Sequence, residues 1–307
     1  MDYNIIVTGG SGSIGNKLAR SFSSDYANVK VIDTNELPSA IKCEPNIKFS
    51  KGSILDYNFL LKEFKNVDFV FHQAGLLSAK ESIEDPKKYV NVNITGTLNV
   101  LNAAKENNVK RVIFASSCSV YGNSKKYPEK EEYFCNPVNP YGISKLAAEH
   151  YCKNYSDLYN LDTVILRYFT VYGPNQNSKS CGVVNLFIQN AINNKVPLID
   201  GRGKQGRDFV FIDDIVKANY KALLLKKMSK GEIFNVGTGK CTSIIVLWSR
   251  ICKILGKDIT PKYVDKDLVE SFKIQADVKK AEKVLGFKAR VSLKQGIKKV
   301  INQHQHF

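Results

Sequence analysis

The sequence predicts an α/β protein built on a doubly wound parallel sheet, followed by a smaller C-terminal domain. Short apolar segments alternate with stretches long enough for a helix, beginning at the first residues. That alternation is typical of parallel sheets, because their strands need helical crossovers between them. A glycine-rich turn at residues 8–15, directly after the first apolar segment, supports the same architecture.

Seven apolar segments predict the strands of the sheet. A parallel strand is buried on both faces, so we expect it to be apolar along its whole length. The seven segments are residues 5–7, 29–32, 47–49, 68–71, 112–114, 164–166 and 233–236. Their spacing leaves room for right-handed crossovers between successive strands.

Two helices have clear amino-terminal signals. Asp85 can cap a helix whose first position is Pro86, and residues 91–104 continue it. Asn139 and Pro140 give the same signal for a second helix, which carries Tyr141 and Lys145. We expect both helices to begin where these pairs stand.

The sequence predicts two domains. Residues 1–168 are expected to form the sheet domain, with residues 207–240 returning to it. Beyond about residue 170 the chain is interrupted by Gly and Pro. We therefore expect residues 169–206 and 241–307 to form a smaller substrate-binding cap over the strand ends.

Composition narrows the classes of function. The 307 residues can bury a full core. The formal charge of +16 comes from 45 basic and 29 acidic residues, and it is spread along the chain in short groups. We interpret it as solvated lysine surfaces and sites for small anions, since no nucleic-acid motif accompanies it. We expect no metal site.

The sequence also predicts a cytoplasmic protein without a membrane partner. Its seven cysteines are scattered and form no CxxC, a pattern that favours reduced thiols. No apolar run reaches the roughly 18 residues needed to cross a bilayer. The first residues carry no basic segment of the kind that opens a signal peptide.

The glycine turn predicts a dinucleotide site of the Rossmann type. Gly9 allows the tight turn, Gly12 lets the backbone approach a pyrophosphate, and Gly15 lets helix and strand pack closely. The amides of the following helix would meet the phosphate oxygens. Asp33, at the end of the second strand, can accept hydrogen bonds from both ribose hydroxyls and would repel a 2′-phosphate. The predicted cofactor is NAD rather than NADP.

Tyr141, Lys145 and Ser117 form the candidate proton-transfer group. Tyr141 and Lys145 are four residues apart and share one helix face. An ammonium about 4 Å from a phenol contributes about 4 kcal/mol at an effective dielectric of about 20. The phenol pKa would fall by about 3, which makes Tyr141 a usable base. Ser117 follows the fifth strand, where ligands of such sheets bind, and can bridge a substrate alcohol and the phenol.

Further motifs resemble the extended short-chain dehydrogenase/reductases, specifically the nucleotide-sugar epimerase/dehydratase family. The resemblance spans nearly the whole chain. Besides the segments above, it includes FHQAG at 71–75, NITGT at 93–97, RYFTVYGP at 167–174, RDFVFIDD at 207–214 and FNVG at 234–237. It implies an NAD enzyme that acts on a UDP-sugar.

The resemblance assigns site residues. Those that would contact NAD are Ser13, Ile14, Asp33, Ser53, Ile54 and Ala74, with Asn93, Tyr141, Lys145 and Phe169 at the nicotinamide half. Those that would contact the substrate are Ser78, Ser117, Thr170, Asn185 and Arg207. Asp213 is expected to cap the following helix. A late arginine of the family has no clear counterpart, and Lys262 or Lys266 would replace it.

The two residues after Ser117 decide among the reactions of the family. Dehydratases carry an Asp-Glu pair there, which supplies the acid and base for elimination. This chain has Cys118 and Ser119 instead. The resemblance therefore favours a UDP-hexose 4-epimerase of the UDP-glucose/UDP-galactose type, which oxidises and re-reduces C4.

Several alternatives stay open at this point. The chain can be a UDP-glucuronate or UDP-N-acetylhexosamine 4-epimerase, or a nucleotide-sugar dehydratase or 4-ketoreductase. A non-catalytic NAD- or RNA-binding protein is the least favoured alternative. By resemblance, the helices near residues 86–106 and 140–158 would pair with their copies in a homodimer.

Overall fold

The computed structural model describes residues 3–25, 28–38, 41, 44, 46–174, 182–265 and 272–305. All seven predicted strands are present and form one parallel sheet in the order β10-β6-β5-β4-β1-β2-β3. They are β1 (Asn4–Thr8), β2 (Asn28–Asp33), β3 (Ile47–Lys51), β4 (Phe69–His72), β5 (Arg111–Ser117), β6 (Thr163–Tyr168) and β10 (Glu232–Val236). The strand order reverses between β1 and β4, which is where such sheets bind ligands.

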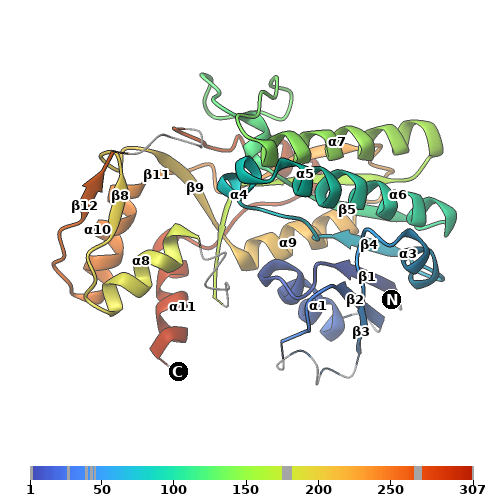
Figure 1. Cartoon of the computed structure of the whole chain (residues 1–307), viewed down its shortest axis with the longest axis horizontal. Coiled ribbons are helices and arrows are strands. Elements are labelled where there is room, and N and C mark those ends of the chain that lie inside the picture. Colours follow the sequence, from blue (N-terminus) through green and yellow to red (C-terminus); the bar gives the residue numbers. More distant parts are fainter. Residues whose placement is uncertain are drawn as a thin grey trace.

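Helices cover both faces of this sheet (Figure 1). One face carries α1 (Ser13–Asp25) and α9 (Ile212–Leu223), and the other carries α3 (Tyr57–Glu63), α6 (Gly96–Glu106) and α7 (Pro140–Tyr159). Leu18 and Phe22 of α1 pack with Ile215 of α9 in one core. Leu101 of α6 and Ala148 of α7 belong to a second core on the opposite face. The predicted doubly wound architecture is confirmed.

Both predicted helix starts are observed, and one helix is irregular. Asp85 accepts a hydrogen bond from Lys88 N and precedes α5 (Pro86–Tyr89). A π-helical segment, η1 (Val90–Thr95), then leads into α6, so the predicted continuous helix is interrupted. Asn139 Oδ1 accepts a hydrogen bond from Gly142 N at 2.9 Å at the start of α7. The remaining short helices are α4 (Ala79–Glu84), η2 (Cys118–Tyr121) and η3 (Ala281–Leu285).

Much of the later part of the chain forms a second group of elements, most of which lies on the left of Figure 1. It contains a three-stranded sheet of β11 (Cys241–Ser243), β9 (Gly206–Phe211) and β7 (Thr170–Tyr172), and a pair formed by β12 (Lys262–Val264) and β8 (Leu198–Asp200). The helices are α8 (Val183–Ile192), α10 (Ile244–Leu255) and α11 (Leu293–Gln305), which share a core with the buried Trp248. β9 lies in this smaller sheet, whereas α9 and β10 pack with the large one. The two-domain division remains a prediction.

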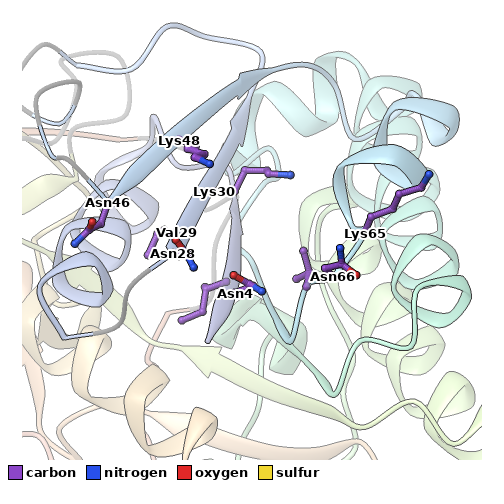
Figure 2. A pocket seen from close by; sticks show the side chains of 10 residues that line it. Asn4, Asn28, Val29, Lys30, Asn46, Lys48, Lys65 and Asn66 are labelled. Carbon is purple, nitrogen blue, oxygen red and sulfur yellow. The ribbon is translucent and has the colours of Figure 1, made fainter. Parts of the chain in front are cut away.

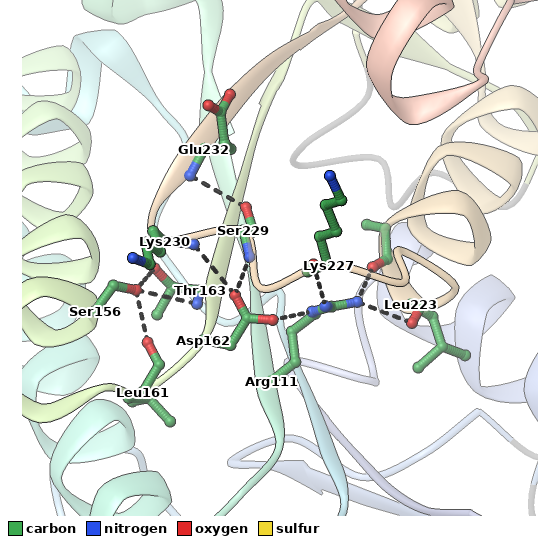
Figure 3. Close-up of polar contacts among 11 residues, drawn as sticks. Arg111, Ser156, Leu161, Asp162, Thr163, Leu223, Lys227, Ser229, Lys230 and Glu232 are labelled. Carbon is green, nitrogen blue, oxygen red and sulfur yellow. Dashed lines mark hydrogen bonds and ion pairs between the residues drawn. The ribbon is translucent and has the colours of Figure 1, made fainter.

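A buried ion pair holds the amino-terminal end of β5 (Figure 3). Arg111 Nε donates to Asp162 Oδ2 at 2.6 Å, and its Nη1 donates to the carbonyls of Ala222 and Leu223 at 2.9 and 3.0 Å. Asp162 Oδ1 accepts a hydrogen bond from Ser229 N at 2.6 Å. The pair therefore joins β5 to the chain between α9 and β10. Removing one partner of such a pair typically costs about 3–5 kcal/mol.

Asp213 does not cap α9, because the capping position is Phe211 and no side chain caps there. Asp213 lies in the first turn instead and forms ion pairs with Lys17 at 3.2 Å and Lys299 at 2.9 Å, so the capping prediction is wrong.

No helix in the described ranges is both long and apolar enough to cross a membrane.

Candidate active site

A cavity of about 530 Å³ lies at the carboxyl ends of the parallel strands. The ends of β1, β2, β4, β5 and β6 contribute to it, as expected for an open α/β sheet. The predicted site residues that line it are Gly9, Gly12, Ser13, Ile14, Gly15, Asp33, Ser53, Ile54, Ala74, Ser117, Tyr141, Lys145 and Phe169. The cavity thus brings the glycine turn and the predicted proton-transfer group together.

The glycine turn has no room for a side chain at Gly9 or Gly15. Gly9 has a φ of +73°, and a Cβ there would lie 2.6 Å from Ala74 N. A Cβ on Gly15 would lie 2.3 Å from Gly9 O. Gly12 N donates to Gly9 O at 3.2 Å, which closes the turn before α1 begins. The first residues of α1, Ser13 to Gly15, line the cavity, and the amides at a helix amino terminus can bind negative oxygens.

Asp33 is held at the end of β2 by backbone amides. Its Oδ2 accepts a hydrogen bond from Ser11 N at 2.9 Å, and its Oδ1 accepts one from Asn35 N at 2.9 Å. Each carboxylate oxygen keeps further acceptor capacity. The carboxylate is therefore fixed beside the cavity and can still accept bonds from ribose hydroxyls.

Lys145 is a buried ammonium on α7. Lys145 is only 3% exposed, and its Nζ donates a hydrogen bond to Ala115 O at 2.9 Å. Nζ also lies 5.0 Å from the centre of the Phe114 ring. Burial lowers the pKa of Lys145 to about 8. Lys145 therefore carries its proton at neutral pH but loses it more readily than a surface lysine.

Tyr141 lies one helical turn before Lys145 and lines the same cavity. It is 8% exposed, and its ring packs edge-on against Tyr89 with 6.4 Å between ring centres. Ser144 Oγ donates to the Tyr141 carbonyl at 2.7 Å. Packing and hydrogen bonds therefore fix the helix turn that presents the phenol.

Ser117 is the last residue of β5, opposite α7. Its Oγ accepts a hydrogen bond from Ser119 N at 3.1 Å and donates to Ser119 Oγ at 3.2 Å. Both contacts are to Ser119, two residues further along the chain. Ser117 lines the same cavity as Tyr141 and Lys145. A hydroxyl, a phenol and an ammonium around one cavity are suited to moving a proton to and from a substrate alcohol.

Comparison with known proteins connects this site to a family. A family model described as the NAD dependent epimerase/dehydratase family matches residues 5–237. The chain belongs to this family. It is 34% identical to the UDP-glucose 4-epimerase of Mycolicibacterium smegmatis over 306 residues, which is 96% of each chain.

Solved structures agree with this assignment to the epimerase/dehydratase family. The UDP-glucose 4-epimerase of Thermotoga maritima, solved with UDP-glucose, has a TM-score of 0.93 at 32% identity and covers 99% of both chains. The UDP-glucuronic acid 4-epimerase of Bacillus cereus, solved with UDP-glucuronic acid and NAD, has a TM-score of 0.92 at 32% identity. It covers 99% of this chain and 100% of the other. The predicted family, fold and cofactor class are confirmed.

The cavity wall offers a free hydrogen-bond donor, which fits the NAD of the epimerase/dehydratase family. Gln73 lines it, and Gln73 Nε2 is buried with no hydrogen-bond partner in the part of the chain that the structure describes. Its Oε1 accepts a hydrogen bond from Tyr168 OH at 3.3 Å, which leaves the amide donor for a ligand acceptor. The sequence prediction missed Gln73, although it stands in the FHQAG segment beside Ala74.

Asn93 lies behind the cavity rather than on its wall. It is 1% exposed, and its Oδ1 accepts a hydrogen bond from Leu76 N at 2.8 Å. Its Nδ2 donates to Leu76 O at 3.1 Å and to Ser144 Oγ at 2.9 Å. Asn93 thus joins the segment after β4 to α7. Its predicted contact with the cofactor remains a prediction.

The predicted substrate residues outside the lining come from several elements. Ser78 accepts a hydrogen bond from Glu81 N at 3.1 Å and caps α4. Thr170 begins β7. Asn185 Nδ2 donates to Gly173 O at 2.9 Å, while its buried Oδ1 has no partner among the described residues. Arg207 Nη1 donates to Gly206 O at 2.9 Å on β9.

Lys262 and Lys266 are the two candidates to replace the missing late arginine. Lys262 begins β12, which pairs with β8. Lys266 lies outside the described residues. The roles predicted for Lys262, Lys266 and the substrate residues above remain predictions.

A second cavity, of about 270 Å³, lies at the amino-terminal ends of β1, β2 and β3 (Figure 2). Its wall carries amides and ammonium groups, among them Asn4, Lys30, Lys48 and Lys65. Lys30 is paired with Glu63 at 3.1 Å. None of the predicted site residues lies among its described lining residues. The acid–base groups predicted from the sequence therefore line the first cavity.

Proposed function

We propose that this protein is a UDP-hexose 4-epimerase of the UDP-glucose/UDP-galactose type. The observation that carries this proposal is the single cavity lined by the glycine turn, Asp33, and the Ser117, Tyr141 and Lys145 side chains. The names of its relatives support the same reaction, since several of them are 4-epimerases of UDP-sugars.

Tyr141 acts as the general base in this proposal. Its phenolate accepts the proton of the sugar C4 hydroxyl, and returns a proton to C4 oxygen when the sugar is reduced again. Ser117 orients that hydroxyl through a hydrogen bond. The Lys145 ammonium stabilises the phenolate, because burial makes their attraction stronger than it would be in water. When bound, NAD supplies the hydride acceptor and donor for C4.

Asp33, Gln73 and the turn around Gly12 hold the cofactor in this proposal. Asp33 accepts hydrogen bonds from the ribose hydroxyls, and the amides of the turn bind the pyrophosphate. Gln73 Nε2 supplies a free hydrogen-bond donor. Arg207 and Asn185 bind the substrate diphosphate from the smaller group of elements. A guanidinium suits that task because it can donate two parallel hydrogen bonds to phosphate.

The residues after Ser117 favour epimerisation over elimination. Cys118 and Ser119 are the first two residues of the short helix η2, and dehydratases of the resemblance carry a carboxylate pair at these positions. Ser119 is bonded to Ser117, and a hydroxyl is a much weaker acid than a carboxylic acid. A water molecule would therefore not be eliminated efficiently from the 4-keto sugar.

The proposal is tested by incubating the purified protein with UDP-glucose, UDP-galactose, UDP-glucuronate and UDP-N-acetylglucosamine, without added NAD. Products are identified by NMR. We expect the C4 epimer of a neutral UDP-hexose, no net consumption of NADH and no accumulated 4-keto sugar. Conversion of UDP-glucuronate or UDP-N-acetylglucosamine alone would assign a different substrate, and a stable 4-keto product would assign a dehydratase.

Tyr141→Phe provides the matched variant. It keeps the ring that packs against Tyr89 and removes only the hydroxyl. We expect turnover to fall by about 10²–10⁴, the range for loss of a general base, while NAD stays bound. Full turnover with bound NAD in this variant would show that Tyr141 is not the base.

A further inference from the structure

A second buried ion pair, between Glu149 and Arg167, lies next to the catalytic groups. Arg167 Nε donates to Glu149 Oε1 at 2.9 Å, and Nη2 donates to Oε2 at 2.7 Å. Ser116 Oγ also donates to Glu149 Oε1. None of these three residues is more than 3% exposed. Two-point binding by a guanidinium holds the carboxylate in one orientation.

Each member of this Ser116–Glu149–Arg167 cluster stands beside a catalytic position. Ser116 directly precedes Ser117 on β5, and Arg167 on β6 pairs with Ser116 in register. Glu149 lies one helical turn after Lys145 on α7. The cluster therefore bonds the end of the strand that presents Ser117 to the helix that presents Lys145.

Lys145 faces few groups that can carry a charge. On β4, burial lowers the pKa of His72 to about 3, so its ring is neutral. On α7, burial raises the pKa of the Cys152 thiol, so it too is neutral. Burial lowers the pKa of Lys145, and the Glu149 carboxylate acts in the opposite direction. Arg167 carries a positive charge, but Glu149 binds it directly.

We propose that Glu149 is a positioning residue for Ser117 and Lys145, which holds β5 against α7 and supplies the negative charge that keeps Lys145 an ammonium. The consequence for catalysis rests on the proposed function, in which that ammonium stabilises the Tyr141 phenolate. Without the Glu149 charge, Arg167 would remain as an unpaired cation in the same region and would further favour the neutral amine. Neutral Lys145 no longer attracts the phenolate.

The test is Glu149→Gln in the NAD-loaded protein. The titration of the Lys145 side chain is followed by NMR, with its signal assigned by its loss in Lys145→Arg. We expect Lys145 to lose its proton at lower pH than in the wild type. We also expect kcat at pH 8 to fall about tenfold with KM changed less than about twofold, and the alkaline limb of the pH profile to move to lower pH.

Two further variants separate charge from folding. Glu149→Asp keeps the charge on a shorter side chain, so it should retain the Lys145 titration midpoint even if it is less stable. If Glu149→Gln is too unstable to titrate, Glu149→Gln with Arg167→Met removes the unpaired guanidinium. The midpoint should still fall in this double variant because the Glu149 charge that raises the Lys145 pKa is gone, but it should fall less than in Glu149→Gln because the Arg167 cation is gone too.

Asp162→Asn is the matched control, because it breaks the buried ion pair at the other end of β5 (Figure 3). It should lower the melting temperature without moving the Lys145 midpoint. An unchanged midpoint in Glu149→Gln, or an equal shift in Asp162→Asn, would leave Glu149 a purely structural residue and overturn the proposal. The titration needs no turnover, so a wild type that epimerises no UDP-sugar would refute the proposed function alone.

Discussion

At the scale of single residues, the site contains a group that works against the stability of the fold. Lys145 keeps a charge at a position that is 3% exposed, and its Nζ donates a hydrogen bond to the Ala115 carbonyl at 2.9 Å. The pKa of Lys145 falls to about 8 because burial penalises the charged form. The folded protein therefore gives up free energy at neutral pH to keep an ammonium where the proposed chemistry needs it.

Lys145→Met should stabilise the protein without NAD while abolishing turnover. An apolar side chain of similar length removes the desolvated charge, and we expect a gain on the order of 2 kcal/mol at pH 7. This gain in the free energy of unfolding should shrink between about pH 8 and the usual lysine pKa of about 10.4. Over that range the folded wild type has already lost its proton and the unfolded chain has not, so wild-type stability rises with pH. Urea unfolding of both proteins at pH 7 and pH 10 measures this, and a destabilised variant at pH 7 would contradict it.

At the scale of elements, a buried carboxyl joins the segment between η2 and α7 to the segment before η3. Glu129 is fully buried, and its Oε2 accepts a hydrogen bond from Gln275 N at 2.8 Å. Its backbone N donates to Gln275 O at 2.8 Å, so the two segments run side by side. Its Oε1 has no partner in the described ranges. Burial, aided by the nearby charge of Asp208, raises the pKa of Glu129 to about 7.

Glu129→Gln should therefore stabilise the protein above pH 7 and have little effect below pH 4.5. Between those values the folded wild type holds a proton that the unfolded chain has released, so wild-type stability falls as pH rises. The amide cannot ionise and keeps an acceptor for Gln275 N, so the variant avoids a loss on the order of 2 kcal/mol. Thermal melts from pH 5 to pH 8 measure the difference. The exposed Glu84→Gln is the control, and a parallel pH dependence in wild type and Glu129→Gln would contradict the prediction.

The elements also show what sequence alone can predict. The seven strands of the large sheet were predictable because each contains a short and mainly apolar run, and Asp85 and Asn139 mark helix starts by their own side chains. Strands β7, β8, β11 and β12 have only three residues each, too few for a periodic pattern. The free donor of Gln73 depends on where Tyr168 lies in space, so no local pattern could have indicated it.

At the scale of the whole molecule, charged groups of α9 connect the two groups of elements. Asp213 binds Lys17 of α1 and Lys299 of α11, at 3.2 and 2.9 Å. Asp214 is buried, and its Oδ2 accepts hydrogen bonds from the amides of Arg290 and Val291 at 3.1 and 2.9 Å. α9 packs on the large sheet, so these contacts position α11 relative to the cofactor side of the cavity.

The whole molecule is expected to be a homodimer that pairs through the face formed by α6 and α7. This expectation comes from the resemblance, and α7 carries a matching apolar stripe: Ile143, Tyr151 and Leu158 are 53%, 39% and 64% exposed. These positions recur at helical spacing, so they share one face of α7.

Light scattering should give twice the chain mass of 34.4 kDa. Tyr151→Glu with Leu158→Glu should give the single-chain mass, because charges in an apolar interface are costly. Leu198→Glu, at a leucine of β8 that is 65% exposed, is the matched control and should stay dimeric. A wild type of single-chain mass, or a double variant that remains dimeric, would rule out this face as the interface.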